Sequence, residues 1–385
     1  MAPTCVFCSL LALGSTTFMP YYKPLFDKFR ENGDQKASLR AAVNLLRLRR
    51  QLHKDIPGRT VSQTLLLATW NLREFGRNRK AGVRLDESLQ YIGEIISHFD
   101  LVAVQEIDQD LRDLQRLMYI LGDWWSYIVT DVTPGRAGNQ ERTAFIYDTR
   151  KVKFDHLAGE VVLPEGKRPT RQVSRSPFIC AFRAGWRRIN LCTVHFYYGS
   201  NNPNDPRRVR EIDAVAQLLA QRNTKRQADA DGEPSNVVLL GDFNVFHAQG
   251  DKTTEALDSH AFVIPQQIRA IQRNKYYDQI AFHDPRKQLR PTARAGVFDF
   301  SQSVFRDADE QFYFKQIKKT IPKLFSKSTN KSRLYRNWRT FQLSDHFPLW
   351  IELRIDFTEG FLATAGGLVA RKRSRITTSL TKDTK

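Results

Sequence analysis

The chain has 385 residues, of which 41% are hydrophobic and 11% aromatic, so it can bury a sizeable core and is not a wholly disordered protein. Its 60 Lys and Arg against 41 Asp and Glu give a net charge of +19, which attracts polyanions: nucleic acid first, then anionic membranes or phosphorylated small molecules. No run approaches the ~18 apolar residues that cross a bilayer, so no integral membrane segment is expected.

The number of cysteines indicates the cellular compartment in which the protein works. Four cysteines in a chain of this length do not make the disulfide framework of a small secreted domain, so a reducing, cytoplasmic location is expected. Cys180 and Cys192 lie on successive strand-like runs and are expected to be buried free thiols. The opening residues contain a short apolar run but no preceding positive charge, which indicates export only weakly.

Residues 1–60 are predicted to form a helical extension. Apolar residues recur at helical spacing over 37–55, and Pro57-Gly58 ends the pattern. We expect this helix to pack on the outside of the main domain. The alternative is an arm for membranes or nucleic acid, built on Arg47, Arg49 and Arg50.

The main domain is predicted to span residues 61–356 and to be rich in strands. Two helices are expected, over 85–98 and 206–221. Many strands with few helices between them predict two sheets flanked by helices, and not a doubly wound parallel sheet. A basic, unstructured tail is expected over 357–385. The predicted strands are 64–70, 101–107, 143–148, 178–182, 189–196, 237–243, 277–282 and 348–355.

Carboxylate, amide and histidine residues stand where these strands end. Each alone has an ordinary explanation as a turn residue, a helix cap or a core histidine. Together they supply carboxylate and amide oxygens, which suit Mg²⁺, Mn²⁺ or Ca²⁺, and two histidines with spare carboxylates, which suit general acid and base chemistry. The set therefore predicts hydrolysis of a phosphate ester. Its members are Asn71, Glu106, His195, Asp242, Asn244, Asp278, Asp345 and His346.

In their order along the chain, the motifs resemble those of the endonuclease/exonuclease/phosphatase superfamily, and within it those of pancreatic-type deoxyribonucleases. The resemblance covers about residues 65–353. It implies a four-layered α/β sandwich of two mainly antiparallel sheets flanked by helices, with the site where the sheets meet at one edge. The similar motifs are Asn71-Leu72-Arg73, Gln105-Glu106, Gly135-Arg136 with Glu141-Arg142, Ser174-Arg175-Ser176-Pro177, His195, Gly241-Asp242-Phe243-Asn244, Tyr277-Asp278-Gln279-Ile280 and Ser344-Asp345-His346.

The resemblance also implies roles for these residues. Glu106 would hold a divalent cation, Mg²⁺ or Mn²⁺ with Ca²⁺ as a further candidate, and Asn71 and Asp345 would lie near it. Which histidine is the base, and whether one cation or two take part, is left open. His346 with Asp278 and His195 with Glu141 would be the two acid–base pairs, Asp242 and Asn244 would contact phosphate, the attacking water or a second cation, and Arg73, Arg136 and Arg175 would bind substrate.

At two places the motifs of this chain differ from those of other subfamilies. Arg73 and His195 stand where apurinic-site endonucleases resembling exonuclease III have an acidic residue and usually a tyrosine. The block Tyr276-Tyr277-Asp278-Gln279 differs from that of inositol-polyphosphate phosphatases. Both differences favour a deoxyribonuclease-like enzyme.

A basic segment at about 310–340 precedes the last motif. Between Glu310 and Asp345 there are nine Lys and Arg, no acid, and several interleaved aromatic residues. This combination predicts a surface that follows a phosphate backbone and offers stacking faces, with Lys318, Lys319 and Lys323 among its cations. The alternative is a solvated helix pair whose aromatic residues belong to the core.

These observations predict a divalent-metal-dependent phosphodiesterase, most simply a monomeric nuclease that hydrolyses DNA with little sequence specificity and leaves 5′-phosphate and 3′-hydroxyl ends. One alternative is a phospholipid or phosphoinositide phosphodiesterase or phosphatase, for which the basic segment and tail would bind a membrane. Another is a nucleic-acid-binding protein of the same fold that has lost turnover.

Overall fold

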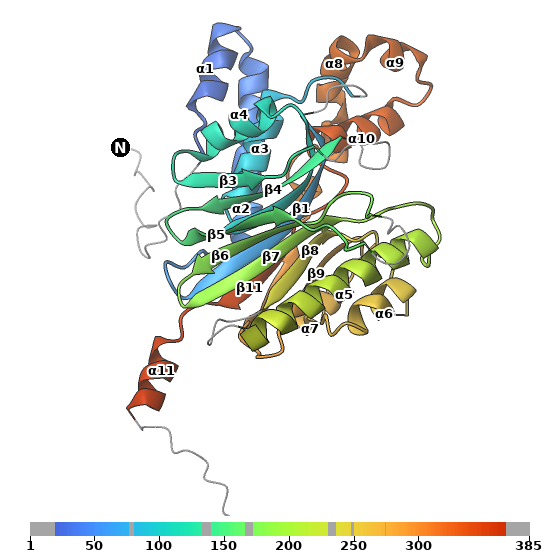
Figure 1. The fold of residues 1–385 in the computed structure, drawn as a ribbon. Coiled ribbons are helices and arrows are strands. Elements are labelled where there is room, and N and C mark those ends of the chain that lie inside the picture. The colour runs from blue at the N-terminus through green and yellow to red at the C-terminus, as the bar shows by residue number, and fades with distance from the viewer. Residues whose placement is uncertain are drawn as a thin grey trace, which may run out of the picture.

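Two sheets packed face to face form the body of the molecule, and helices cover their outer faces (Figure 1). The computed structural model describes residues 20–76, 81–132, 140–165, 172–229, 236–247, 250–273 and 275–366. The six-stranded sheet has the order β10 (Pro291–Val297), β11 (Leu349–Arg354), β1 (Thr64–Phe75), β2 (Leu101–Asp108), β4 (Glu141–Asp148) and β3 (Trp125–Val129). The five-stranded sheet has the order β5 (Val152–Glu160), β6 (Phe178–Ala184), β7 (Arg187–His195), β8 (Val237–Asp242) and β9 (Asp278–His283).

Strand pairing in both sheets is mainly antiparallel. Among the described strands, only β1 with β2 and β7 with β8 are parallel neighbours. The predicted sandwich is therefore confirmed, and all eight predicted strands form. Strands β3, β5 and β10 were not predicted, and each of them lies at the edge of a sheet. An edge strand buries less of its surface than a central one, so its sequence carries a weaker apolar pattern.

Both predicted helices are present, as α3 (Asp86–Ile96) and α5 (Pro206–Asp229). Three further helices in the main domain were not predicted: α4 (Arg112–Leu121), α6 (Lys252–Asp258) and α7 (Gln266–Arg269). The last two have seven and four residues, too few to show a helical period in the sequence. Two short 3₁₀ turns complete the domain, at Phe300–Gln302 and Asp307–Asp309.

The core between the sheets is rich in aromatic and aliphatic side chains. Phe145 of one sheet contacts Phe178 and Phe182 of the other, with ring centroids 6.0 and 5.4 Å apart. Cys180 and Cys192 are buried free thiols, as expected. In the β6–β7 register Cys192 pairs with Ile179, so the two cysteines do not face each other across the hairpin.

The N-terminal extension lies against the helical face of the six-stranded sheet. It contains α1 (Lys23–Glu31) and α2 (Gln35–Asp55), and α2 buries Leu45, Leu48 and Leu52 in the core beneath α3. Arg49 Nη1 lies 2.7 Å from Glu94 Oε1 on α3, whose side chain is fully buried. Arg47 Nη1 donates to the carbonyl of Ser303 at 3.0 Å. Arg47 and Arg49 therefore hold the extension in place and are not the exposed cations of an arm.

Replacing Arg49 by alanine is expected to lower the free energy of unfolding by about 3 kcal/mol, because it leaves the buried Glu94 carboxylate without its cationic partner. Urea denaturation measures the change. Arg50, the exposed neighbour on the same helix, provides the matched alanine control. Equal stability of the two variants would show that the extension does not depend on this ion pair.

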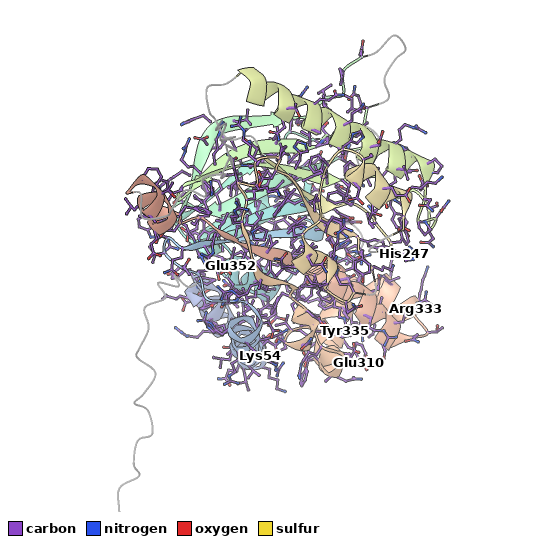
Figure 2. The ribbon with its side chains drawn as sticks, turned by 90° about the horizontal axis from the view of Figure 1, so that it is seen from below. Lys54, His247, Glu310, Arg333, Tyr335 and Glu352 are labelled. Carbon is purple, nitrogen blue, oxygen red and sulfur yellow. The ribbon has the colours of Figure 1, made fainter. Side chains whose placement is uncertain are left out.

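The basic segment folds into three helices, α8 (Glu310–Thr320), α9 (Pro322–Lys327) and α10 (Lys331–Gln342), beside α2 (Figure 2). The side chains of Tyr313, Tyr335 and Trp338 are at most 1% exposed and pack on one another and on Phe305. The expectation that they offer stacking faces was wrong, since composition does not tell which side of a helix is buried. Phe312, at 65% exposure, does face solvent.

The tail is ordered further than expected. In place of an unstructured start at residue 357, the chain forms α11 (Thr358–Ala365), and Asp356 just before it accepts the backbone N–H of Thr358 at 2.9 Å. Phe361 packs on Trp186 of the β6–β7 turn, with ring centroids 5.3 Å apart. The rest of the predicted tail lies outside the described residues. Among the helices described, none combines the length and the apolar character needed to cross a membrane.

Candidate active site

A cavity of about 490 Å³ opens where the two parallel strand pairs end, at the opposite end of β1 from α11. Asn71 and Asp278 lie directly behind its wall, bonded to residues that line it. Arg136 falls outside the described residues, and Lys318, Lys319 and Lys323 lie on α8 and α9, away from the cavity wall. The other predicted site residues line the cavity: Arg73, Glu106, Glu141, Arg175, His195, Asp242, Asn244, Asp345 and His346.

Asn71 joins the two sheets at the floor of the site. Its Nδ2 donates to Glu106 Oε1 at 2.7 Å and to Asp242 Oδ2 at 3.2 Å, while its Oδ1 accepts the backbone N–H of Arg73 at 2.9 Å. The second oxygen of Glu106 accepts the backbone N–H of Glu74 at 2.9 Å. Carboxylates from both sheets thus converge on one amide.

The backbone is strained where these side chains emerge. Arg73, Glu74, Glu106 and Asn244 all have positive φ, between 40° and 62°, which side chains other than glycine seldom adopt. Such conformations cost of order 1–3 kcal/mol each and persist only where the surrounding structure holds them. Their concentration at this cavity indicates a functional site.

Position 241, where β8 passes close to β7, accepts only glycine. Its φ is +140°, and a Cβ atom there would lie 2.0 Å from the carbonyl oxygen of Val194. The close approach sets His195 beside Asp242 as register partners at the ends of the two strands. The side chain of Asp242 then accepts the backbone N–H of Asn244 at 2.9 Å, and Asn244 Nδ2 donates to the carbonyl of Phe196 at 3.0 Å.

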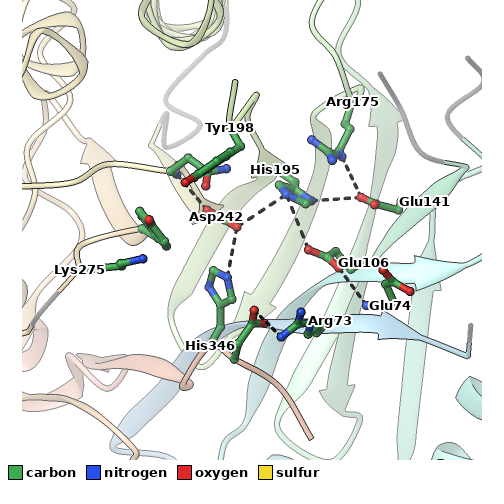
Figure 3. Close-up of a pocket in the computed structure, with 13 residues that line it drawn as sticks. Arg73, Glu74, Glu106, Glu141, Arg175, His195, Tyr198, Asp242, Lys275 and His346 are labelled. Atoms are coloured by element: carbon green, nitrogen blue, oxygen red, sulfur yellow. Dashed lines mark hydrogen bonds and ion pairs between the residues drawn. The ribbon is translucent and has the colours of Figure 1, made fainter. Parts of the chain in front are cut away.

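His195 stands between three carboxylates (Figure 3). Its Nδ1 lies 3.2 Å from Glu141 Oε2, and its Nε2 lies 3.6 Å from Asp242 Oδ2 and 3.9 Å from Glu106 Oε1. Arg175 Nε donates to the same Oε2 of Glu141 at 2.8 Å. The structure therefore brings together the predicted pair His195 and Glu141 and adds Arg175 as the cation that holds the carboxylate.

His346 forms the second pair on the other side of Asp242. Its Nδ1 donates to Asp278 Oδ2 at 2.9 Å, and its Nε2 lies 3.7 Å from Asp242 Oδ2. The loop is fixed by Ser344 Oγ, which donates to the carbonyl of Asn71 at 2.6 Å, and by Trp70 Nε1, which donates to the carbonyl of His346 at 2.9 Å.

The charges of His346, Asp278 and Asp242 shift one another's pKa values. Burial alone would lower the pKa of His346, but the adjacent Asp278 and Asp242 carboxylates raise it well above its ordinary value. Burial raises the pKa of Asp278 against the opposing effect of His346. Burial would also raise the pKa of Asp242, yet His346 and His195 lower it. The geometry thus stabilises a protonated His346 beside an ionised Asp242.

Arg73 and Asp345 are paired with each other at the rim. Arg73 Nη1 lies 2.8 Å from Asp345 Oδ2, and its guanidinium stacks on the ring of Phe341 in α10 at 4.0 Å from the centroid. Arg73 also donates to the hydroxyl of Thr340 on the same helix. The last helix of the basic segment is therefore joined directly to the rim of the site.

Four cavity residues were not predicted from the sequence as site residues: Glu74, Tyr198, Lys275 and Tyr277. Tyr198 follows the predicted strand 189–196 by two positions, and Lys275 precedes Tyr276-Tyr277-Asp278. The position of Tyr198 and Lys275 near strand ends was the signal available in the sequence. Neither is a carboxylate, an amide or a histidine, the residue types from which the site was predicted.

The comparison with protein families decides the assignment. Residues 68–300 match the model of the Endonuclease/Exonuclease/phosphatase family. The chain belongs to this family. Its members are hydrolases of phosphoester bonds and generally use a divalent metal ion. The predicted resemblance is confirmed, and with it the coarse chemistry of the site.

A curated relative lies in the deoxyribonuclease branch. The chain is 25% identical to Deoxyribonuclease-1 of Canis lupus familiaris over 187 residues, which is 47% of this chain and 60% of that protein. The chain thus spans less than two thirds of the length of the relative it matches.

Several solved structures are similar to this chain at low sequence identity. An endonuclease/exonuclease/phosphatase family protein from Bacteroides thetaiotaomicron is 16% identical with a TM-score of 0.48, covering 78% of this chain and 98% of its own. A mannosyl-6-phosphatase from the same species is 17% identical with a TM-score of 0.46, covering 75% and 99%. The human Nocturnin catalytic domain is 12% identical with a TM-score of 0.46, covering 75% and 94%. At these identities the structures say nothing about the substrate of this chain.

The residues present fit a divalent cation. Glu106 and Asp242 bring carboxylates from two sheets onto one amide, and the Glu106 side chain remains 17% exposed to the cavity. Oxygen donors without sulfur ligands suit Mg²⁺ or Mn²⁺.

Another group of metal-ligand type, Asp242, Asp278 and His346, has atoms within 4.8 Å of one another. Its His346 Nδ1 is already bonded to Asp278, which is buried behind the cavity wall. This favours proton transfer over metal binding for that pair.

Proposed function

We propose that the chain is a divalent-metal-dependent nuclease that hydrolyses DNA with little sequence specificity and leaves 5′-phosphate and 3′-hydroxyl ends. One observation carries the proposal: two imidazoles, each backed by its own carboxylate, approach the same oxygen of Asp242 from two sides, at 3.6 and 3.7 Å. A phosphodiester held between His195 and His346 would have a proton acceptor on one side and a proton donor on the other.

His195 and His346 divide the proton transfers. One accepts a proton from the attacking water, and the other donates a proton to the leaving 3′-oxygen. Asp278 fixes the orientation of the His346 ring through its Nδ1 atom and stabilises the imidazolium form of that residue. Glu141 lies 3.2 Å from Nδ1 of His195 on the other side of Asp242. Asp242 lies between the two Nε2 atoms, where it can orient the water, and Asn244 beside it can donate to phosphate oxygens.

Glu106, with Asn71 and Asp345 near it, would hold the cation. When bound, the cation supplies positive charge that offsets the negative charge developing on the phosphoryl oxygens. Arg175 lines the same cavity and adds a fixed positive charge.

Placement of the basic regions favours nucleic acid over lipid. Thr64, at the start of β1, lines a cavity beneath α11, whereas Asn71 of the same strand lies at the active site. Seven residues of strand at about 3.3 Å each separate the two ends by about 23 Å. The surface formed by α11 therefore lies at the far end of the sandwich from the catalytic histidines. The basic segment, by contrast, adjoins the rim through Arg73 and Phe341.

The activity itself is tested by product analysis with purified protein and Mg²⁺. Plasmid DNA should yield 5′-phosphate ends, and vesicles of phosphatidylcholine or phosphoinositide should release neither phosphocholine nor inorganic phosphate. Lipid hydrolysis without DNA cleavage would favour the lipid phosphodiesterase. Binding of DNA without any turnover would favour the inactive family member.

Neutralising Lys318, Lys319 and Lys323 together to glutamine is expected to raise KM for DNA and leave kcat nearly unchanged, because contacts far from the reacting atoms bind ground and transition states alike. All three side chains are exposed and, within the described residues, form no ion pair. The salt dependence of log KM should flatten by about 0.9 for each DNA phosphate that the variant no longer neutralises.

The matched control neutralises three exposed lysines elsewhere, Lys54, Lys153 and Lys287. A chromogenic small phosphodiester should be hydrolysed equally by both triple variants and by the wild type. If the two triple variants change KM for DNA equally, only net charge matters and the basic segment has no special role.

A further inference from the structure

We propose that Tyr198 and Lys275 form a subsite that stacks one unpaired base beside the scissile phosphate, so that the enzyme acts on single-stranded or locally unpaired DNA. The proposal rests on the nuclease function and names the form of nucleic acid that the site accepts. Figure 3 shows both residues on one side of Asp242, with Glu141 and Arg175 on the other.

Tyr198 is a supported aromatic surface. Its ring packs on Phe246 at 6.2 Å, tilted by 31°, and meets Tyr277 edge-on at 6.2 Å. Phe246 and Tyr277 are themselves edge-on at 5.2 Å, so the three rings brace one another. Tyr198 nevertheless stays 40% exposed and lines the cavity, which leaves part of its ring surface open to a ligand. A rigid exposed aromatic ring at a phosphate site is the surface on which bases stack.

Lys275 places a positive charge next to this surface. Its Nζ lies 4.8 Å from the centroid of the Tyr277 ring, and Tyr277 in turn contacts His346 with ring centroids 6.0 Å apart. The ammonium group thus lies against the same ring that contacts the catalytic histidine, where it could bind the phosphate next to the scissile one. A lysine there binds phosphate as a point charge.

The shape of the site explains why the base must be unpaired. The stacking surface lines a cavity of about 490 Å³, which has room for one extruded nucleotide. A base inside duplex DNA is covered on both faces by its neighbours, and extruding it costs a few kcal/mol. Single strands and frayed ends do not carry that cost.

The test compares three substrates of equal length: a single-stranded oligonucleotide, the same backbone carrying abasic tetrahydrofuran units, and the duplex. Wild-type enzyme should cleave the base-bearing single strand with the highest kcat/KM. Tyr198→Ala should lower kcat/KM on that strand about tenfold, as expected when one base no longer stacks on an aromatic ring, and leave the abasic strand unchanged. Tyr198→Phe keeps the ring and should behave like the wild type.

Lys275→Met should weaken binding of the base-bearing and abasic strands alike, since it removes a phosphate-binding cation. The slope of log KM against log salt should fall by about 0.7. Trp186→Ala provides the matched aromatic control, because Trp186 is 52% exposed but lies at the far end of the sandwich. It should leave all three substrates unaffected.

Equal loss of activity by Tyr198→Ala on base-bearing and abasic strands, or no loss on either, would overturn the subsite while the nuclease function stands. Failure of the wild type to cleave any of the three would overturn both. Should Tyr198→Ala not fold, as judged by its urea midpoint, Tyr198→Leu keeps apolar bulk against Phe246 without an aromatic face. The same comparison then applies to it.

Discussion

Replacing His346 by alanine is expected to lower kcat on DNA by at least about 10²-fold, because the residue transfers a proton. The loss of its bond to the buried Asp278 should also lower the free energy of unfolding without preventing folding. His195→Ala should have an effect of the same size on kcat for the same reason. Steady-state kinetics on plasmid DNA, together with urea denaturation of each variant, separates catalysis from folding.

The chain offers a matched control for these variants. His260 Nε2 lies 2.9 Å from Asp213 Oδ1, a second histidine–aspartate pair remote from the cavity. His260→Ala should leave kcat unchanged. Cleavage at the wild-type rate by His195→Ala or His346→Ala would remove that histidine from the mechanism, and with it the paired arrangement on which the proposed function rests.

Replacing Glu106 by glutamine is expected to abolish Mg²⁺-dependent cleavage, since an amide is a weaker and neutral ligand for a hard cation. The substitution is nearly isosteric, so the fold should persist. Glu160→Gln, at an exposed strand end in the other sheet, is the control. Activity is measured across a Mg²⁺ titration, and addition of EDTA should abolish the activity of the wild type. Full activity in EDTA would overturn the assignment of a metal to this site.

Prediction from the sequence succeeded where a buried strand ends in a residue that can bind a metal ion or transfer a proton. Central strands carry long apolar runs, and a polar residue at the end of such a run, such as Glu106 or Asp242, is conspicuous. Three of the four edge strands in the described sheets, β3, β5 and β10, lack such a run and were therefore missed, whereas the edge strand β9 carries one and was predicted. The pairing of His195 with Glu141 followed from the family resemblance and not from spacing.

The remaining features depend on three-dimensional contacts that composition does not reveal. Tyr335 and Trp338 alternate with basic residues in the sequence, yet both turn inward onto Tyr313. Tyr198 and Lys275 lie close to strand ends but are neither carboxylates, amides nor histidines, and they meet at the site because the loops after β7 and before β9 come together there. Arg73 looks like a free cation in the sequence, but the structure pairs it with Asp345.

The order in which the strands enter the sheets has a consequence for biosynthesis. Strand β11 is the last of the described strands along the chain, yet it lies inside the six-stranded sheet, between β10 and β1. His346 and the loop that fixes it directly precede β11. A growing chain on the ribosome therefore lacks the pair of His346 and Asp278 until the loop before β11 has been made. The site proposed here to cleave nucleic acid therefore stays incomplete in the nascent chain until β11 inserts between β10 and β1.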